Sequence, residues 1–163
     1  MKPTRFVAIL AVLFAASLIA QEPGTRVPSV TFAPVGKVQV RPGGSAAVQM
    51  DFRVGTDFHI NSNQPKSELL IPTQLKLSAG PPVSIASLKY PDGDDVSFPF
   101  APGEKLSVYS GDFSITTVVK AAASARPGDY AVNGELRFQA CDRSACYPPR
   151  AIPVKFTVSV VGK

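Results

Sequence analysis

The stretch Ala151-Ile152-Pro153-Val154-Lys155-Phe156-Thr157-Val158-Ser159-Val160 decides the fold, because apolar and polar residues alternate along almost its whole length. This period of two is typical of a β-strand that buries one face and exposes the other. It predicts a strand whose core residues are Ile152, Val154, Phe156, Val158 and Val160.

The same alternation recurs in earlier runs, separated by turns rich in proline and glycine. The turns are expected at residues 41–44, 79–82, 91–94 and 126–129. Sixteen prolines and twelve glycines leave little room for a long helix. We therefore expect an all-β fold, an immunoglobulin-like antiparallel β-sandwich of seven or eight short strands. The earlier core residues would be Val48, Met50, Phe52, Val54, Leu75, Leu77, Phe113, Ile115, Thr117, Val119, Val132, Leu136, Phe138 and Ala140.

The N-terminus has the layout of an export signal. Lys2 and Arg5 precede an apolar run over residues 6–16, and small residues follow it. This predicts a signal peptide over residues 1–20, cleaved after Ser17 or Ala20, with an uncleaved anchor as the alternative. A flexible leader over residues 21–34 and one domain over residues 35–163 would follow. The exported protein would lie where disulfides persist, with no membrane span after cleavage.

Composition excludes several classes of function. The formal charge is +5, of which Lys2 and Arg5 supply two positive charges, and the other basic residues are scattered. This distribution does not indicate nucleic-acid binding. The chain has one histidine and no glycine-rich phosphate loop, so hydrolase and nucleotide chemistry are not indicated, and we expect no cofactor.

The two cysteines, Cys141 and Cys146, are the only ones in the chain. A disulfide across so short a loop would stabilise the fold by about 2 kcal/mol, against more than about 4 kcal/mol for a loop of about a hundred residues. A zinc site would need two further ligands, and the sole histidine, His59, lies far away in the sequence. Two interpretations remain open: a hairpin staple and a redox-active pair.

The parity of the strands bears on the geometry of this pair. If Leu136, Phe138 and Ala140 face the core, Cys141 should lie on the outer face with Arg137 and Gln139. Directly opposed residues of two antiparallel strands have a constant sum of residue numbers. Even-numbered core residues on both strands require this sum to be even, whereas Cys141 and Cys146 give an odd sum. Either the hairpin contains a β-bulge or the two strands are not neighbours. Such an irregular, accessible disulfide is open to attack by a partner thiolate.

The run Phe138-Gln139-Ala140-Cys141 through Cys146-Tyr147-Pro148-Pro149 resembles the N-terminal periplasmic domain of the thiol:disulfide interchange protein DsbD. The segments 58–61, 72–77 and 106–111 support the resemblance, which extends over residues 35–160. Two features depart from the family pattern. Some members have five residues between the cysteines where this chain has four, and tyrosines occur in the best-known members at the places of His59 and Asn61.

The resemblance implies roles for individual residues. Cys141 and Cys146 would be catalytic, with Cys146 forming the mixed disulfide with a partner and Cys141 resolving it. A cap loop would shield the pair, and here Phe98 and Phe100 would serve, within the long loop expected over residues 87–104. His59, Asn61 and Tyr147 would line the site, with Tyr147 beside the sulfurs and no metal bound.

The resemblance also implies a function. We expect an exported, periplasmic thiol–disulfide exchange module, a thiol:disulfide oxidoreductase of the protein-disulfide reductase type. It would pass reducing equivalents between a thioredoxin-like or membrane electron donor and disulfide-bearing clients. We expect a monomeric, stand-alone version, without the family's membrane and thioredoxin-like domains. The alternative is a non-enzymatic immunoglobulin-like binding or assembly module whose hairpin disulfide is structural.

Overall fold

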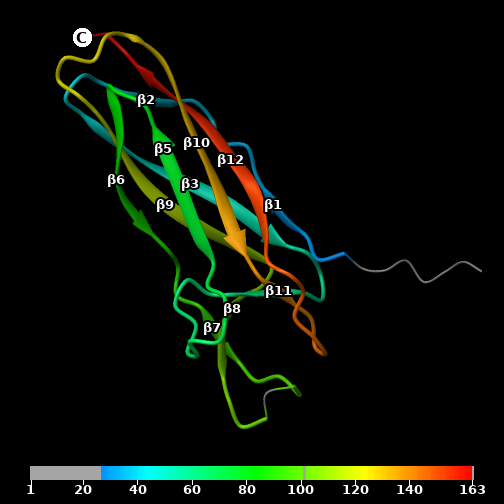
Figure 1. Cartoon of the computed structure of the whole chain (residues 1–163). Coiled ribbons are helices and arrows are strands. Elements are labelled where there is room, and N and C mark those ends of the chain that lie inside the picture. Colours follow the sequence, from blue (N-terminus) through cyan, green and yellow to red (C-terminus); the bar gives the residue numbers. More distant parts are fainter. Residues whose placement is uncertain (1–26, 101, 163) are drawn as a thin grey trace, which may run out of the picture.

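The computed structural model describes residues 27–100 and 102–162, which form twelve β-strands in three four-stranded sheets (Figure 1). The first sheet has the order β1-β3-β9-β6, with bounds Val30–Phe32, Ser45–Val54, Asp112–Ala121 and Val83–Lys89. The second has the order β2-β12-β10-β5, with bounds Val38–Val40, Arg150–Val160, Gly128–Phe138 and Gln74–Ala79. The third has the order β11-β4-β8-β7, with bounds Ala140–Cys141, His59–Asn61, Leu106–Tyr109 and Asp94–Val96.

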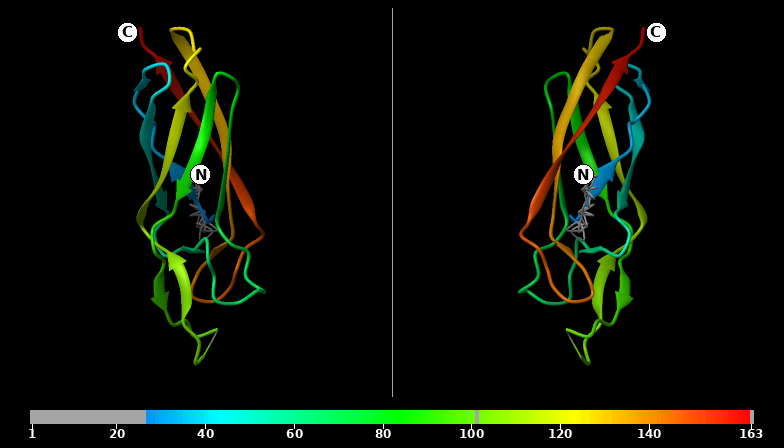
Figure 2. Two further views of the ribbon diagram at one scale, coloured as in Figure 1. Left: turned by 90° about the vertical axis from the view of Figure 1, so that its left-hand side faces the viewer. Right: turned by 90° about the vertical axis from the view of Figure 1, so that its right-hand side faces the viewer.

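The first two sheets face each other as a sandwich, and the third lies at the end away from the C-terminus (Figure 2). The all-β, immunoglobulin-like expectation is confirmed, although the described residues form more strands than the seven or eight predicted. The additional strands are only two to four residues long, too short for an alternation of polar and apolar residues to reveal them.

The core contains most of the residues that the alternation predicts. Val48, Met50, Phe52 and Val54 of β3 are buried, as are Val154, Phe156, Val158 and Val160 of β12, while Ile152 is partly buried. Phe52 and Phe113 stack at 5.3 Å between ring centroids and join β3 to β9. Apolar burial between the two sheets therefore holds the sandwich together.

The ladder between β10 and β12 ends next to the segment that contains the two cysteines. It is antiparallel and regular from the pair Gly128–Val160 to the pair Phe138–Arg150. On the other side of β10, Gly134 lies opposite Leu77 of β5. A Cβ atom at Gly134 would lie 2.2 Å from Lys76 O and 2.7 Å from Leu77 Cδ2, so this close approach requires glycine.

Residues 1–26, which include the predicted signal peptide and most of the leader, lie outside the described residues. The leader was expected to extend to residue 34, but Val30–Phe32 forms β1 and pairs with β3.

The short strand β2 pairs with β12 in parallel, an exception in an otherwise antiparallel fold. No helix in the described ranges is long and apolar enough to cross a membrane.

Two strands interrupt the segment 87–104, which was expected to be one long loop. Ser87–Lys89 completes β6 and Asp94–Val96 forms β7, so the loop proper is limited to residues between β7 and β8. The Tyr109 hydroxyl anchors this end of the molecule, because it lies 2.6 Å from Asn63 Oδ1 and 3.0 Å from Pro91 O. Lys66 Nζ also pairs with Asp95 at 2.5 Å.

Candidate functional site: the Cys141–Cys146 hairpin

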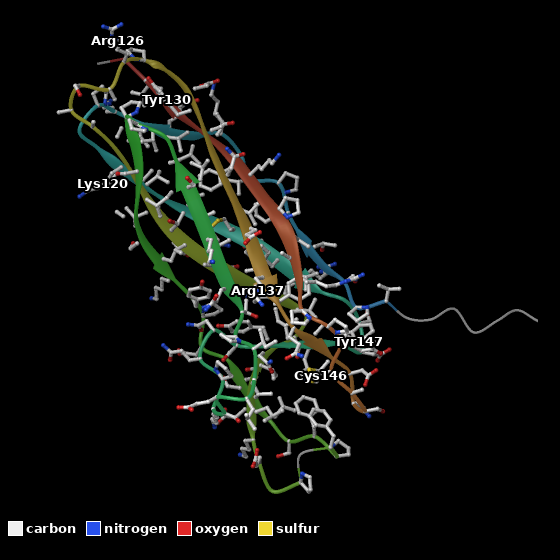
Figure 3. The ribbon with its side chains drawn as sticks, viewed as in Figure 1. Lys120, Arg126, Tyr130, Arg137, Cys146 and Tyr147 are labelled. Atoms are coloured by element: carbon white, nitrogen blue, oxygen red, sulfur yellow. A yellow bond between two sulfur atoms is a disulfide. The ribbon has the colours of Figure 1, made fainter. Side chains whose placement is uncertain are left out.

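A disulfide joins Cys141 to Cys146 in the hairpin that follows the β10–β12 ladder (Figure 3). Regular pairing ends at Phe138 with Arg150, yet Tyr147 N donates to Ala140 O at 2.8 Å. Gln139 therefore faces both Pro148 and Pro149, which makes a β-bulge. Proline has no backbone N–H to donate to a ladder, which explains why the extra residue is accommodated there. The predicted bulge is confirmed, and the alternative of non-neighbouring strands is wrong.

The two cysteines differ sharply in exposure. Cys141 is 1% exposed, whereas Cys146 is exposed to solvent. The expectation that Cys141 shares an exposed outer face with Arg137 and Gln139 is therefore wrong. After Phe138 the chain leaves β10 and pairs with β4 as β11, so Cys141 belongs to the third sheet and is buried there. One sulfur-bearing residue is thus accessible to a partner protein while the other is enclosed.

His59 is the residue directly opposite Cys141 on β4. Opposed residues of antiparallel strands project from the same face, so the imidazole and the Cys141 sulfur share one side of the sheet. The His59 side chain is buried, and its Nε2 atom has no hydrogen-bond partner in the described part of the chain. Burial lowers the pKa of His59 from 6.5 to about 4, which the carboxylate of Asp142 opposes only in part. The ring is therefore neutral near pH 7.

Asp142 organises the turn between the cysteines. Its Oδ1 atom accepts hydrogen bonds from Ser144 N at 2.7 Å and Ala145 N at 2.9 Å, and Oδ2 accepts one from the Tyr147 hydroxyl at 2.7 Å. These bonds, that of Tyr147 foremost, lower the pKa of the Asp142 carboxyl. The charged carboxylate therefore ties both sides of the hairpin together around the disulfide.

The aromatic residues of the loop after β7 form a stack that begins at His59. The Phe98 ring lies 4.0 Å from the His59 ring with 17° between the planes, and Phe100 stacks on Phe98 at 5.3 Å. Phe98 thus covers the residue opposite Cys141, and Phe100 extends the stack to the surface, where it is 39% exposed. The structure brings both predicted cap residues to the end of the molecule that carries the disulfide.

Asn61 and Tyr147 hold the surroundings of the pair in place. Asn61 is fully buried, and its Nδ2 atom donates to Ile71 O at 2.9 Å, which fastens the segment that follows β4. Tyr147 was expected beside the sulfurs; its ring packs edge-on against Phe58 with centroids 5.8 Å apart. Its backbone carbonyl also accepts a hydrogen bond from Gln139 Nε2 at 3.2 Å.

No metal centre is evident in the described residues, where no three His, Cys, Asp or Glu side chains lie close enough to hold an ion. In this form the two sulfurs are bonded to each other, so neither is available as a thiolate ligand. The chemistry that the site offers is exchange of the disulfide itself.

Sequence reasoning missed two contributors to the site. No role was predicted for Asp142, although an aspartate at the start of a four-residue turn is a recognised turn-forming signal. Phe58 was noted only as part of a matching segment. No local pattern could reveal its contact with Tyr147, because the two residues lie on distant parts of the chain.

Comparisons with known proteins bear on this geometry. No curated protein matches the chain. The solved N-terminal domain of DsbD from Neisseria meningitidis, in the reduced form, is 17% identical, with a TM-score of 0.41 over 69% of this chain and 76% of that one. The same domain in a complex with the PilB N-terminal domain is 16% identical, with a TM-score of 0.44 over 76% and 80%. The seventh ScaB type I cohesin of Pseudobacteroides cellulosolvens is 12% identical, with a TM-score of 0.49 over 79% and 90%.

The family model provides the decisive match. The model described as the N-terminal part of the thiol:disulfide interchange protein DsbD matches residues 29–157, which include both cysteines and nearly the whole sandwich. This range also begins before β1, in agreement with its place in the first sheet. The chain therefore belongs to the family of DsbD N-terminal domains.

Proposed function

We propose that the chain is an exported thiol–disulfide exchange module, active in the periplasm as a thiol:disulfide oxidoreductase. The observation that carries the proposal is the unequal exposure of the pair, with Cys146 open to solvent and Cys141 enclosed. Membership of a family described by thiol:disulfide interchange supports it.

The geometry suggests the order of events. A thiolate of a thioredoxin-like donor attacks the exposed Cys146 sulfur, and Cys141 leaves as a thiolate. The donor's second thiol then displaces Cys146 from the mixed disulfide, so the donor is oxidised and this pair is reduced. The reduced pair passes its electrons to a client disulfide by the reverse sequence, with Cys146 as nucleophile.

Phe98 and Phe100 have the role of a cap in this proposal. Phe98 covers His59, the residue opposite Cys141, and a docking partner would displace the stack to reach the enclosed side of the pair. In the absence of a partner, the stack would protect the enclosed Cys141 thiol of the reduced pair from small oxidants. Its position in a loop between two short strands leaves it free to move without disturbing the sandwich.

Trapping tests the assignment of the two cysteines. The Cys141→Ser protein should form a stable mixed disulfide through Cys146 with a thioredoxin-like protein, because the resolving thiolate is missing. The matched Cys146→Ser protein should not, since its remaining cysteine is enclosed. Both adducts can be counted by non-reducing electrophoresis and mass spectrometry. Trapping by Cys146→Ser alone would reverse the assignment.

The alternative function, a binding or assembly module with a structural disulfide, makes an opposite prediction. A structural disulfide has a reduction potential below about −300 mV and does not exchange with protein dithiols. Equilibration of the purified protein with dithiothreitol and with a reduced thioredoxin distinguishes the two. Resistance to both would reject the exchange function.

A further inference from the structure

The Nε2 atom of His59 is a buried polar atom for which the disulfide form offers no partner among the described residues. A buried polar atom without a partner destabilises the fold, so its retention calls for an explanation. Asn61 Oδ1, on the same face of β4, is also buried without a partner, so these two atoms do not satisfy each other. His59 is thus left with an unused hydrogen-bonding atom when the disulfide is closed.

Reduction creates a new acceptor on the face of the sheet that carries this ring. Cys141 is directly opposite His59, and opposed residues of an antiparallel pair have Cβ atoms roughly 4.5–5.5 Å apart. A disulfide sulfur is a weak acceptor, whereas a thiolate is a charged and strong one. Resting on the exchange function above, we propose that His59 Nε2–H donates a hydrogen bond to the Cys141 thiolate that is released when the disulfide is reduced.

The step balances as an ordinary exchange. The donor thiolate forms a bond to Cys146 Sγ, the Cys141–Cys146 bond breaks, and its electron pair leaves on Cys141 Sγ. His59 keeps its proton and contributes only the hydrogen bond. The donor's second thiolate then attacks the donor sulfur of the mixed disulfide, which forms the donor's own disulfide and releases Cys146 as a second thiolate. Two electrons have then passed to the pair.

The surroundings favour this role for a neutral ring. A thiolate on Cys141 would be enclosed, and an enclosed charge requires a donor nearby. The charged group acting on His59 is Asp142, from the hairpin, and its carboxylate would disfavour a second negative charge on Cys141. Phe98 stacks flat on the imidazole from the cap loop and fixes the ring plane without using a nitrogen atom.

The proposal predicts a shift of the redox equilibrium. Because the hydrogen bond exists only in the reduced form, it makes the pair easier to reduce. His59→Phe keeps an aromatic ring for Phe98 but removes the donor. The equilibrium constant for reduction by dithiothreitol should fall about tenfold, the value of one hydrogen bond to a charged group. For a two-electron couple this equals about 30 mV.

One titration and two further variants separate this effect from a change in folding. In the Cys146→Ser background, ultraviolet thiolate absorbance titrates Cys141 alone, and His59→Phe should raise its pKa. Thr73→Val is the matched control, because Thr73 Oγ1 donates to Asn61 O on the same strand as His59. It should lower the stability of the fold but leave the redox equilibrium unchanged. His59→Gln, which retains an amide N–H, should restore part of the shift, and it serves as the second variant if His59→Phe fails to fold.

These experiments distinguish failure of the His59 hydrogen bond from failure of the exchange function. If the wild-type pair does not equilibrate with dithiothreitol or thioredoxin, the exchange function itself is rejected. If the wild-type pair exchanges but His59→Phe has the wild-type equilibrium constant, the role of His59 is rejected. A fall in the Cys141 pKa in His59→Phe would also overturn it, since the nitrogen would then be an acceptor from the thiol.

Discussion

Acidification should destabilise the oxidised protein through His59, and the size of the effect follows from the burial of the ring. The pKa of His59 is about 4 in the folded protein, against an ordinary value of 6.5. The unfolded chain therefore takes up a proton before the folded one does. Stability is fully retained above pH 6.5 and is lost as the pH falls from 6.5 to about 4.

The loss of unfolding free energy between pH 6.5 and 4 has an upper limit of about 3 kcal/mol, because each pKa unit corresponds to about 1.36 kcal/mol. Solvent screening and relaxation around a protonated ring reduce this upper limit, so we expect a loss of about 1–2 kcal/mol. Asp51, Asp112, Asp129 and Asp142 all have pKa values lowered from 3.8, so their contribution is lost only at lower pH.

Urea denaturation at a series of pH values between 4 and 7.5, without reductant, measures the effect. His59→Phe is the matched variant, since it cannot take up a proton at this position. Its unfolding free energy should be nearly constant over the interval in which that of the wild type falls. At pH 7.5 the variant should be at least as stable as the wild type, because it lacks the unpaired Nε2 atom. Parallel pH profiles for the two proteins would refute this reasoning.

Three further predictions concern the cap, the ladder and the hairpin. Replacing both Phe98 and Phe100 by alanine should speed oxidation of the reduced pair by hydrogen peroxide several-fold, with the sandwich still folded. The control Leu69→Ala, at a side chain that is 93% exposed, should leave the oxidation rate unchanged. A wild-type oxidation rate in the double variant would reject the cap. Gly134→Ala should lower the free energy of unfolding by about 1–3 kcal/mol, because its Cβ would clash with Lys76 O. The control Gly80→Ala should change the free energy of unfolding little, because a Cβ at Gly80 would meet no atom within 4 Å. Equal urea midpoints for the two variants would contradict this prediction. Tyr147→Phe should raise the pKa of Asp142 but leave it below 3.8, since Ser144 N and Ala145 N still donate to the carboxylate. An unchanged pKa of Asp142 in a carboxyl NMR titration would show that the Tyr147 hydroxyl does not lower it.

The sequence by itself determined which face of each long strand is buried. Alternation along residues 152–160 is a property of the local chain, because successive side chains of a strand point to opposite faces. The same parity required either a bulge at the cysteines or strands that are not neighbours, and the structure has the bulge. The cysteine motif also indicated the family, because spacing within one hairpin is a local feature.

Only the tertiary structure decided what surrounds the pair. Periodicity assigns a face to a residue but does not say which strand comes to lie beside it. Cys141 was expected on an open face, yet pairing of β11 with β4 encloses it and places His59 opposite. The stack of Phe98 on His59 likewise depends on where the β7–β8 hairpin lies. Contacts between distant segments of the chain, formed when the third sheet assembles, therefore give the two cysteines their different environments.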